Sequence, residues 1–161
     1  MGKEKYPVTP AVRFLKANNV QFETFEYVYE EKGGTKQSAL ELNVDENLVI
    51  KTLIFSADGM TICVLMHGDM EVSTKELARQ LNVKVIVPSE EKTAFNNTGY
   101  KFGGTSPFGT RKMLPIYIES SILSNEMVYI NGGKQGFLLG INPEVIKTLL
   151  GAEEVNVGIK K

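Results

Sequence analysis

The sequence has very few of the residues on which disulfides and metal clusters depend. Its 161 residues include one cysteine, one histidine and no tryptophan. A single cysteine, Cys63, excludes an intramolecular disulfide and indicates a reducing compartment. With His67 as the only histidine, a His/Cys metal cluster is excluded, and no Gly-x-Ser-x-Gly motif accompanies His67 as a serine hydrolase would require. We therefore expect Cys63 to be a buried, inert thiol and His67 to be a structural residue at a strand end.

The chain also lacks eighteen consecutive apolar residues and an apolar N-terminal segment. We expect no membrane-spanning segment, no signal peptide and a cytoplasmic location. The net charge of −1 argues against a surface that coats nucleic acid, and DNA is not an expected partner. However, no acidic residue occurs from Lys92 to Ile118. A locally positive surface built by the second half of the chain is therefore expected.

Composition and pattern predict a single mixed α/β domain over residues 1–161, built around one sheet or open barrel. Hydrophobic residues make up 42% and charged residues 23% of the chain, as in ordinary globular proteins. Helix-capping residues and β-branched runs alternate along the sequence. Helices are predicted from about residues 10–18, 34–42, 74–80 and 143–150, and a further short helix is predicted to begin at Ser89-Glu90-Glu91. Strands are predicted at 20–29, 49–55, 60–67, 83–87, 115–118, 127–130 and 137–141.

Lys51 is the first candidate for chemistry. It lies in an almost continuous apolar run over residues 49–55, where side chains alternate between the two faces of a strand. Both faces are mostly apolar, which predicts a strand buried on both sides. A lysine in such a strand either faces a cavity or extends along the surface from the strand end. The pattern alone leaves both interpretations open.

Two glycine-rich segments are candidates for backbone recognition of a ligand. Residues 98–109 place Gly103-Gly104 before Thr105-Ser106-Pro107, and residues 132–136 form a second glycine turn that contains Lys134. Glycine lets a ligand approach peptide N–H groups, which can bind an anion or a polarised carbonyl. The same segments are also typical of tight connections between strands. Neither has the spacing of a phosphate-binding P-loop, so a nucleoside triphosphatase is not expected.

Taken together, these motifs resemble the YbaK/EbsC family of free-standing aminoacyl-tRNA deacylases, which are related to the editing domain of bacterial prolyl-tRNA synthetase. The matching pieces keep the family's order from about residue 9 to about residue 150. They are Thr9-Pro10-Ala11-Val12, Glu26-Tyr27, Ile50-Lys51-Thr52-Leu53, Leu77-Ala78, Thr98-Gly99-Tyr100, Gly103-Gly104-Thr105-Ser106-Pro107, Leu114-Pro115 and Gly132-Gly133-Lys134.

The resemblance implies a twisted, barrel-like mixed sheet flanked by helices, and hydrolysis of the ester that joins a wrong amino acid to the tRNA 3′ end. It implies Lys51, Gly103 and Gly104 as catalytic residues, and neither a metal nor another cofactor. The expected partners are the aminoacyl-tRNA 3′ end and prolyl-tRNA synthetase. The expected substrate-binding residues are Tyr27, Thr52, Thr105, Ser106, Asn131, Gly132 and Lys134.

The sequence departs from the cysteine-editing pattern near the second glycine turn. Asn131 replaces a serine, Gln135 replaces an arginine, and Leu138 stands where that pattern has an acidic residue. Cys-tRNA(Pro), Ala-tRNA(Pro) and tRNA carrying another small amino acid therefore remain open as substrates. Two other functions also remain open: a non-catalytic module that binds aminoacyl-tRNA or a synthetase, and a hydrolase of small esters or thioesters.

Overall fold

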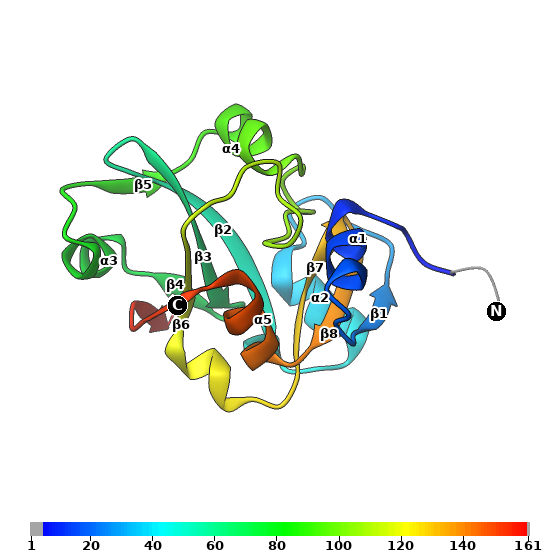
Figure 1. The fold of residues 1–161 in the computed structure, drawn as a ribbon. Coiled ribbons are helices and arrows are strands. Elements are labelled where there is room, and N and C mark those ends of the chain that lie inside the picture. The colour runs from blue at the N-terminus through cyan, green and yellow to red at the C-terminus, as the bar shows by residue number, and fades with distance from the viewer. Residues whose placement is uncertain (1–4, 161) are drawn as a thin grey trace.

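The computed structural model describes residues 5–160 as a mixed sheet with helices packed around it (Figure 1). The helices are α1 (Pro10–Ala17), α2 (Gly34–Leu42), α3 (Thr74–Leu81), α4 (Glu91–Thr98) and α5 (Pro143–Leu150), with 3₁₀ turns η1 (Glu46–Leu48) and η2 (Ser120–Ser124). The strands are β1 (Glu23–Glu26), β2 (Val49–Ala57), β3 (Met60–His67), β4 (Met70–Val72), β5 (Ile86–Pro88), β6 (Ile116–Glu119), β7 (Val128–Lys134), β8 (Phe137–Ile141), β9 (Glu153–Val155) and β10 (Gly158–Lys160).

The main sheet has the strand order β1-β8-β7-β2-β3-β6-β9, and β5 also pairs with β2. The contacts of β2 with β3 and β5 are antiparallel, whereas its contact with β7 is parallel. Strands β4 and β10 form a separate antiparallel pair. The predicted fold class, a mixed sheet flanked by helices, is confirmed.

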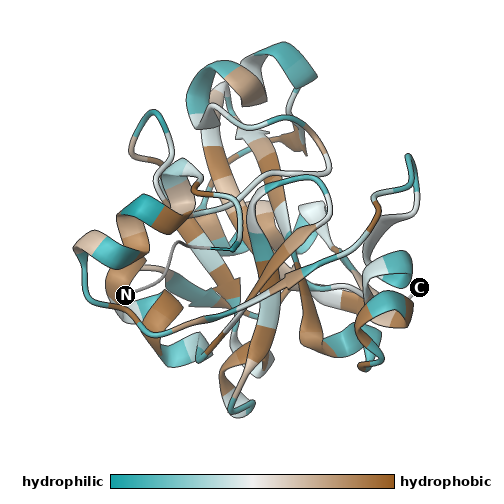
Figure 2. Ribbon diagram, turned by 90° about the vertical axis from the view of Figure 1, so that its right-hand side faces the viewer, coloured by the Kyte–Doolittle hydropathy of each residue, from teal (hydrophilic) through white to brown (hydrophobic). Residues whose placement is uncertain are grey.

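Strand β2 contributes to three separate hydrophobic clusters. Ile50 belongs to the largest cluster, which includes side chains of α1 and α5. Phe55 packs in a second cluster with Leu77 of α3, and Val49 packs in a third with Ala39 of α2. The predicted burial of β2 on both faces is therefore confirmed at its ends. Figure 2 shows the same arrangement as apolar colour on the strands in the middle of the molecule.

Helix α1 begins where the sequence predicts, and its cap also holds it to the sheet. The Thr9 hydroxyl accepts the Val12 N–H at 3.1 Å and donates to the Gly132 carbonyl of β7 at 2.5 Å. The hydroxyl thus satisfies a free N–H of the first turn and a main-chain carbonyl at the end of β7. Thr9 is 8% exposed, so water cannot easily replace either bond.

The strand predicted at 20–29 is shorter in the structure, and the strand predicted at 83–87 is displaced. In both places a side chain forms hydrogen bonds with the main chain. Only Glu23–Glu26 of the segment 20–29 pairs with β8. Beyond it, the Gln37 amide donates to the Val28 carbonyl at 2.8 Å and accepts the Glu30 N–H at 3.1 Å. The strand predicted at 83–87 is instead Ile86–Pro88, because Asp58 accepts the N–H groups of residues 84 and 85.

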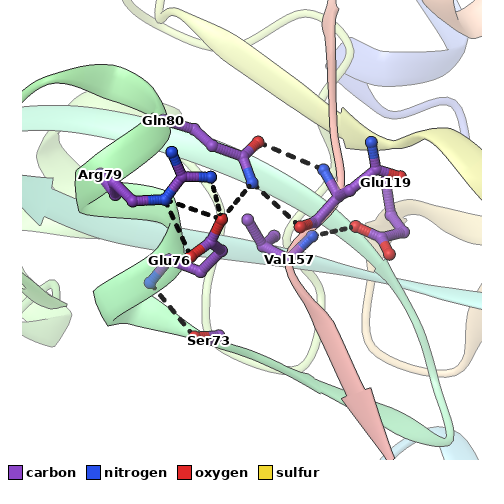
Figure 3. A network of polar contacts seen from close by, with 7 residues as sticks. Ser73, Glu76, Arg79, Gln80, Glu119 and Val157 are labelled. Carbon is purple, nitrogen blue, oxygen red and sulfur yellow. Dashed lines mark hydrogen bonds and ion pairs between the residues drawn. The ribbon is translucent and has the colours of Figure 1, made fainter.

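The short strands β4, β9 and β10 were not predicted, and long-range polar contacts place the last of them (Figure 3). The buried Glu119 carboxylate accepts the Val157 N–H at 2.8 Å and the Gly158 N–H at 3.1 Å. The Gln80 amide forms two hydrogen bonds with the Asn156 main chain, at 3.0 and 3.4 Å. A three-residue strand held by side chains elsewhere in the chain has no periodic signal of its own.

Thr9→Ala is expected to lower the free energy of unfolding by about 1–2 kcal/mol, because the variant loses the α1 cap and leaves the Gly132 carbonyl without its donor. Urea denaturation measures the change. Thr9→Ser keeps the hydroxyl and should recover most of the loss. Equal destabilisation by the two substitutions would contradict a role for the hydroxyl.

Candidate functional site: a cavity at the open edge of β2

One edge of β2 is left without a partner strand in its middle. On that side β7 pairs with residues 49–50 and β5 pairs with residues 55–57. The chain between them, residues 51–54, borders a cavity of about 530 Å³. All seven residues from Val49 to Phe55 line this cavity. Consecutive residues of a strand can do so only when the strand presents its backbone edge to the space.

The peptide groups of Thr52 point to this open edge. In an antiparallel pair, consecutive residues direct their N–H and C=O groups alternately toward and away from the partner. The Val49 carbonyl accepts the N–H of Gly68, just beyond β3, whereas the Ile54 carbonyl accepts the Ser89 N–H on the opposite side. Thr52, two residues before Ile54, therefore directs both groups away from β3 and into the gap between β7 and β5.

The Thr52 hydroxyl is also unsatisfied. Its Oγ1 is buried and has no hydrogen-bond partner among residues 5–160. Buried polar groups in folded proteins are nearly always hydrogen-bonded, and an exception needs an explanation. Thr52 lines the cavity, but this oxygen has almost no accessible surface, so the groups that a ligand can reach at this residue are those of its main chain.

Lys51 lies on the opposite face of the strand from Thr52. Its neighbours on that face are Val49, in the cluster beneath α2, and Leu53, against the cluster beneath α3. Lys51 stands between these two clusters, partly buried, and its ammonium group donates to the Met70 carbonyl. Lys51 also lines the cavity, so the lining includes a cationic residue of β2.

The opposite wall is formed by residues 98–109 and 131–136, which are bound together as one unit. The Asn131 amide donates to the Gly103 carbonyl at 3.0 Å, and its oxygen accepts the Gly133 and Lys134 N–H groups at 2.6 and 3.1 Å. Gln135 donates to the Phe102 carbonyl at 2.9 Å. The two glycine segments identified in the sequence are thus in direct contact.

Gly103 and Gly104 serve this unit in different ways. Gly103 has φ +85°, and a Cβ there would lie 2.4 Å from the Tyr29 hydroxyl. A Cβ on Gly104 would lie 2.8 Å from the main-chain nitrogen of Gln135. The Gly104 N–H donates to the Lys101 carbonyl at 2.9 Å, so it is not available to an oxyanion in this conformation.

The fold brings together six of the ten residues selected from the sequence. Lining the cavity are Tyr27, Lys51, Thr52, Gly103, Thr105 and Asn131. Gly104 and Lys134 instead line a neighbouring cavity. Ser106 is fully buried, where its hydroxyl accepts the Phe108 N–H, and the Gly132 carbonyl binds Thr9.

Sequence reasoning missed the part of the site that α2 and the preceding segment build. This part comprises Lys32, Gly34, Thr35 and Ser38, all of which line the cavity beside Tyr29. Ser38 lies 2.7 Å from the Tyr27 hydroxyl and is joined to it by a hydrogen bond. The spacing of Tyr27 and Tyr29 was the available signal, since two aromatic residues two positions apart face the same side of an extended chain.

Among the lining residues within 5–160 there is no aspartate, glutamate or histidine, whereas Lys32 and Lys51 are both present. The same part of the chain contains no group of three or more His, Cys, Asp or Glu side chains placed to hold a metal ion. The charged residues that line the cavity are therefore lysines, and its other polar groups are hydroxyls, amides and main chain.

No helix within residues 5–160 is both long and apolar enough to span a bilayer.

His67 lies outside the cavity and is held on both sides. Its Nδ1 lies 2.7 Å from the Asn47 carbonyl and its Nε2 lies 2.8 Å from the Ser121 hydroxyl. Because a carbonyl only accepts, Nδ1 donates to Asn47, while Nε2 shares a hydrogen bond with the Ser121 hydroxyl. With 2% exposure, His67 joins η1 and η2 to the end of β3, in agreement with the structural role expected from the sequence.

The parts of this chain that are similar to known proteins contain the residues that line the cavity. Residues 30–149 match the aminoacyl-tRNA editing domain. The chain is 26% identical over its full length to EbsC of Enterococcus faecalis, named as a candidate Cys-tRNA(Pro)/Cys-tRNA(Cys) deacylase, and covers all of that protein. It is 30% identical over 64% of its length to proline–tRNA ligase of Streptococcus uberis, and the match spans 17% of that ligase.

Solved structures show the same fold. The hypothetical protein APE2540 superposes with a TM-score of 0.85 at 22% identity, covering 93% of this chain and 99% of that one. A candidate trans-editing enzyme for prolyl-tRNA synthetase superposes with a TM-score of 0.81 at 19% identity, covering 96% and 99%. The fold thus places the chain in the class of mixed α/β proteins that these structures represent. Within that class, the chain belongs to the aminoacyl-tRNA editing domain family, as its resemblance to YbaK/EbsC proteins predicted.

The Cys63 thiol is expected to be inert in the folded protein. Burial raises its pKa to about 12, so the thiol stays protonated at pH 8 and the nucleophilic thiolate is scarce. Native protein should react with iodoacetamide far more slowly than protein unfolded in guanidinium chloride, as measured by mass spectrometry. Similar rates in both states would contradict this burial.

Gly103→Ala is expected to destabilise the protein more than Gly59→Ala. Both glycines have positive φ, +85° and +89°, but a Cβ on Gly59 would have no heavy atom within 4 Å. Gly59→Ala therefore measures backbone strain alone, about 1 kcal/mol, while Gly103→Ala adds the collision with Tyr29. Thermal unfolding compares them, and equal losses would contradict the close packing of Gly103 against Tyr29.

Proposed function

We propose that this protein hydrolyses the ester between a small, uncharged amino acid and the 3′-terminal ribose of a mischarged tRNA. The observation that carries the proposal is the open edge of β2, where Lys51 and the main chain of Thr52 share one cavity with Gly103 of the opposite loop. Hydrolysis breaks the bond between the acyl carbon and the ribose oxygen, consumes one water, and releases the free amino acid and uncharged tRNA.

An aminoacyl ester is already activated, so positioning and charge stabilisation are the main requirements. The Thr52 N–H and the Lys51 ammonium are the donors best placed to stabilise negative charge on the carbonyl oxygen or to hold the terminal phosphate. Gly103 supplies a main-chain surface that the acyl group can approach closely. These residues act by hydrogen bonding and electrostatics, and no covalent enzyme intermediate is needed.

The nucleophile is proposed to be a positioned water or a hydroxyl of the substrate itself. No carboxylate or imidazole lines the cavity among residues 5–160, and both ring nitrogens of His67 are engaged elsewhere. Carboxylates and imidazoles are the side chains that most often act as general bases. We favour electrostatic catalysis over side-chain proton abstraction for this reason.

The cavity wall supports a preference for small, uncharged acyl groups. Leu138, 4% exposed, lines the cavity together with Val49 and Leu53. A charged side chain would lose its hydration against these residues without gaining a partner of opposite charge, unless it were an anion near Lys51. Cysteine and alanine attached to tRNA for proline are the proposed substrates. The name of EbsC supports cysteine, and the small size and low polarity of alanine fit the apolar wall.

The relatives also support prolyl-tRNA synthetase as a partner. Proline–tRNA ligases contain a matching segment within their own chains, whereas EbsC matches this chain from end to end. We propose that this chain acts in trans on tRNA released by, or still bound to, that synthetase.

A non-catalytic binding module is the second candidate function. It is favoured by the side-chain contacts of Asn131, whose amide binds Gly103, Gly133 and Lys134 of the two glycine segments, and by the lack of a carboxylate or imidazole among the lining residues within 5–160. Such a module would bind charged tRNA and release it unhydrolysed.

Lys51→Met is expected to lower kcat/KM for deacylation by roughly 10²- to 10³-fold, because loss of one donor to a developing oxyanion has that effect in other acyl-transfer sites. The measurement uses tRNA for proline charged separately with cysteine, alanine and proline. Lys75→Ala, at an exposed position on α3 that lines neither cavity, is the matched control. Unchanged thermal stability of Lys51→Met would show that the loss is not due to unfolding.

Equal rates for wild type and Lys51→Met would remove Lys51 from the mechanism. No hydrolysis of any charged tRNA by wild type, together with tight binding of the charged form, would contradict the deacylase and support the binding module.

A further inference from the structure

A second cavity, of about 450 Å³, adjoins the first on the far side of the Gly103-Gly104 loop. Tyr29 lines both cavities, Gly103 lines only the first, and Gly104 lines only the second. The loop and the Tyr29 ring therefore form a thin wall between them. The second cavity is lined by Tyr29, Phe95, Gly99, Tyr100, Lys101, Gly104, Gly133, Lys134 and Gln135.

The second cavity is cationic as well. It contains Lys101 and Lys134, and no carboxylate among the described lining residues. Both lysines are exposed, and neither forms an ion pair with a carboxylate within residues 5–160. Two lysines that are not neutralised by a described carboxylate attract an anion to this cavity.

Exposed aromatic side chains line both cavities, together with their lysines. Phe95 is 39% exposed at the second cavity, and Phe102, 45% exposed, lines the first. The Arg111 guanidinium lies 5.2 Å from the centre of the Phe95 ring. Exposed aromatic rings beside lysine and arginine are typical of surfaces that bind single-stranded nucleic acid, where bases stack and phosphates meet cations.

The second cavity is built on a rigid floor. Gly104 packs so closely on the 134–135 peptide that a Cβ would lie 2.8 Å from the Gln135 nitrogen. Asn131 and Gln135 hydrogen-bond the same loop. A site held in place before binding loses less conformational entropy when its ligand arrives.

We propose that the second cavity binds the nucleotide that precedes the terminal adenosine of the tRNA 3′ end. Lys101 and Lys134 contact its phosphate, and its base stacks at Phe95, while the aminoacyl-adenosine occupies the first cavity. This inference rests on the proposed deacylase function, because it requires the charged 3′ end to enter the first cavity. Such a nucleotide site would let the protein distinguish the 3′ end of an RNA strand from a small free ester.

The test compares two substrates that differ by one nucleotide. Alanine is esterified to the 3′ end of adenosine or of the dinucleotide cytidylyl-adenosine, and kcat/KM is measured for each. Wild type should prefer the dinucleotide ester by roughly tenfold, the effect of one stacked base and its phosphate. The variants Lys101→Ala/Lys134→Ala and Phe95→Ala should each reduce this ratio toward 1, whereas Lys75→Ala should keep it.

A ratio near 1 in wild type, or one that both variants leave unchanged, would overturn the proposed nucleotide site. A second measurement separates this result from failure of the deacylase itself. Hydrolysis-resistant amide analogues of the two substrates are titrated by fluorescence or calorimetry. If wild type hydrolyses neither ester, the proposed function fails, and the binding ratio of the analogues alone decides the nucleotide site. Tighter binding of the dinucleotide analogue that is lost in the variants supports it, and equal binding contradicts it.

Discussion

The site depends on one constraint: β2 must pair with two different strands on the same edge. Its first residues lie beside β7, which runs parallel to it, and its last residues lie beside β5, which runs antiparallel. Because neither partner covers the middle, the peptide of Thr52 faces an open space instead of a neighbouring strand. An unpaired strand edge in the interior of a sheet costs hydrogen bonds. A polar ligand that binds at this edge would restore them.

The same gap accounts for the partial burial of Lys51. Side chains on either side of it belong to separate clusters, one beneath α2 and one beneath α3. A lysine placed between two apolar clusters keeps its stem packed, and the ammonium group of Lys51 donates to the Met70 carbonyl of β4. A hydrogen-bond partner at this position offsets part of the desolvation cost of a partly buried charge.

The opposite wall shows how glycines allow two loops to act as one surface. Gly103 and Gly104 let residues 98–109 approach Tyr29 on one side and the 134–135 peptide on the other. Asn131 fixes this contact with three hydrogen bonds. Replacement of a serine by Asn131, which marks a departure from the cysteine-editing pattern, therefore has a structural consequence beyond any effect on specificity.

The sequence by itself determined most of the helices, the β2–β3 hairpin, the family resemblance, and the inert roles of Cys63 and His67. These follow from local signals such as capping residues, turn residues and side-chain alternation, which act over a few positions. Only the tertiary structure decided that Lys51 and Gly103 share a cavity, that Gly104 and Lys134 face a second one, and that Ser106 is buried. The short strands β9 and β10 also depended on it, since distant residues such as Glu119 hold the C-terminal segment. Contacts between residues fifty or more positions apart arise from packing and strand pairing, which no local pattern encodes.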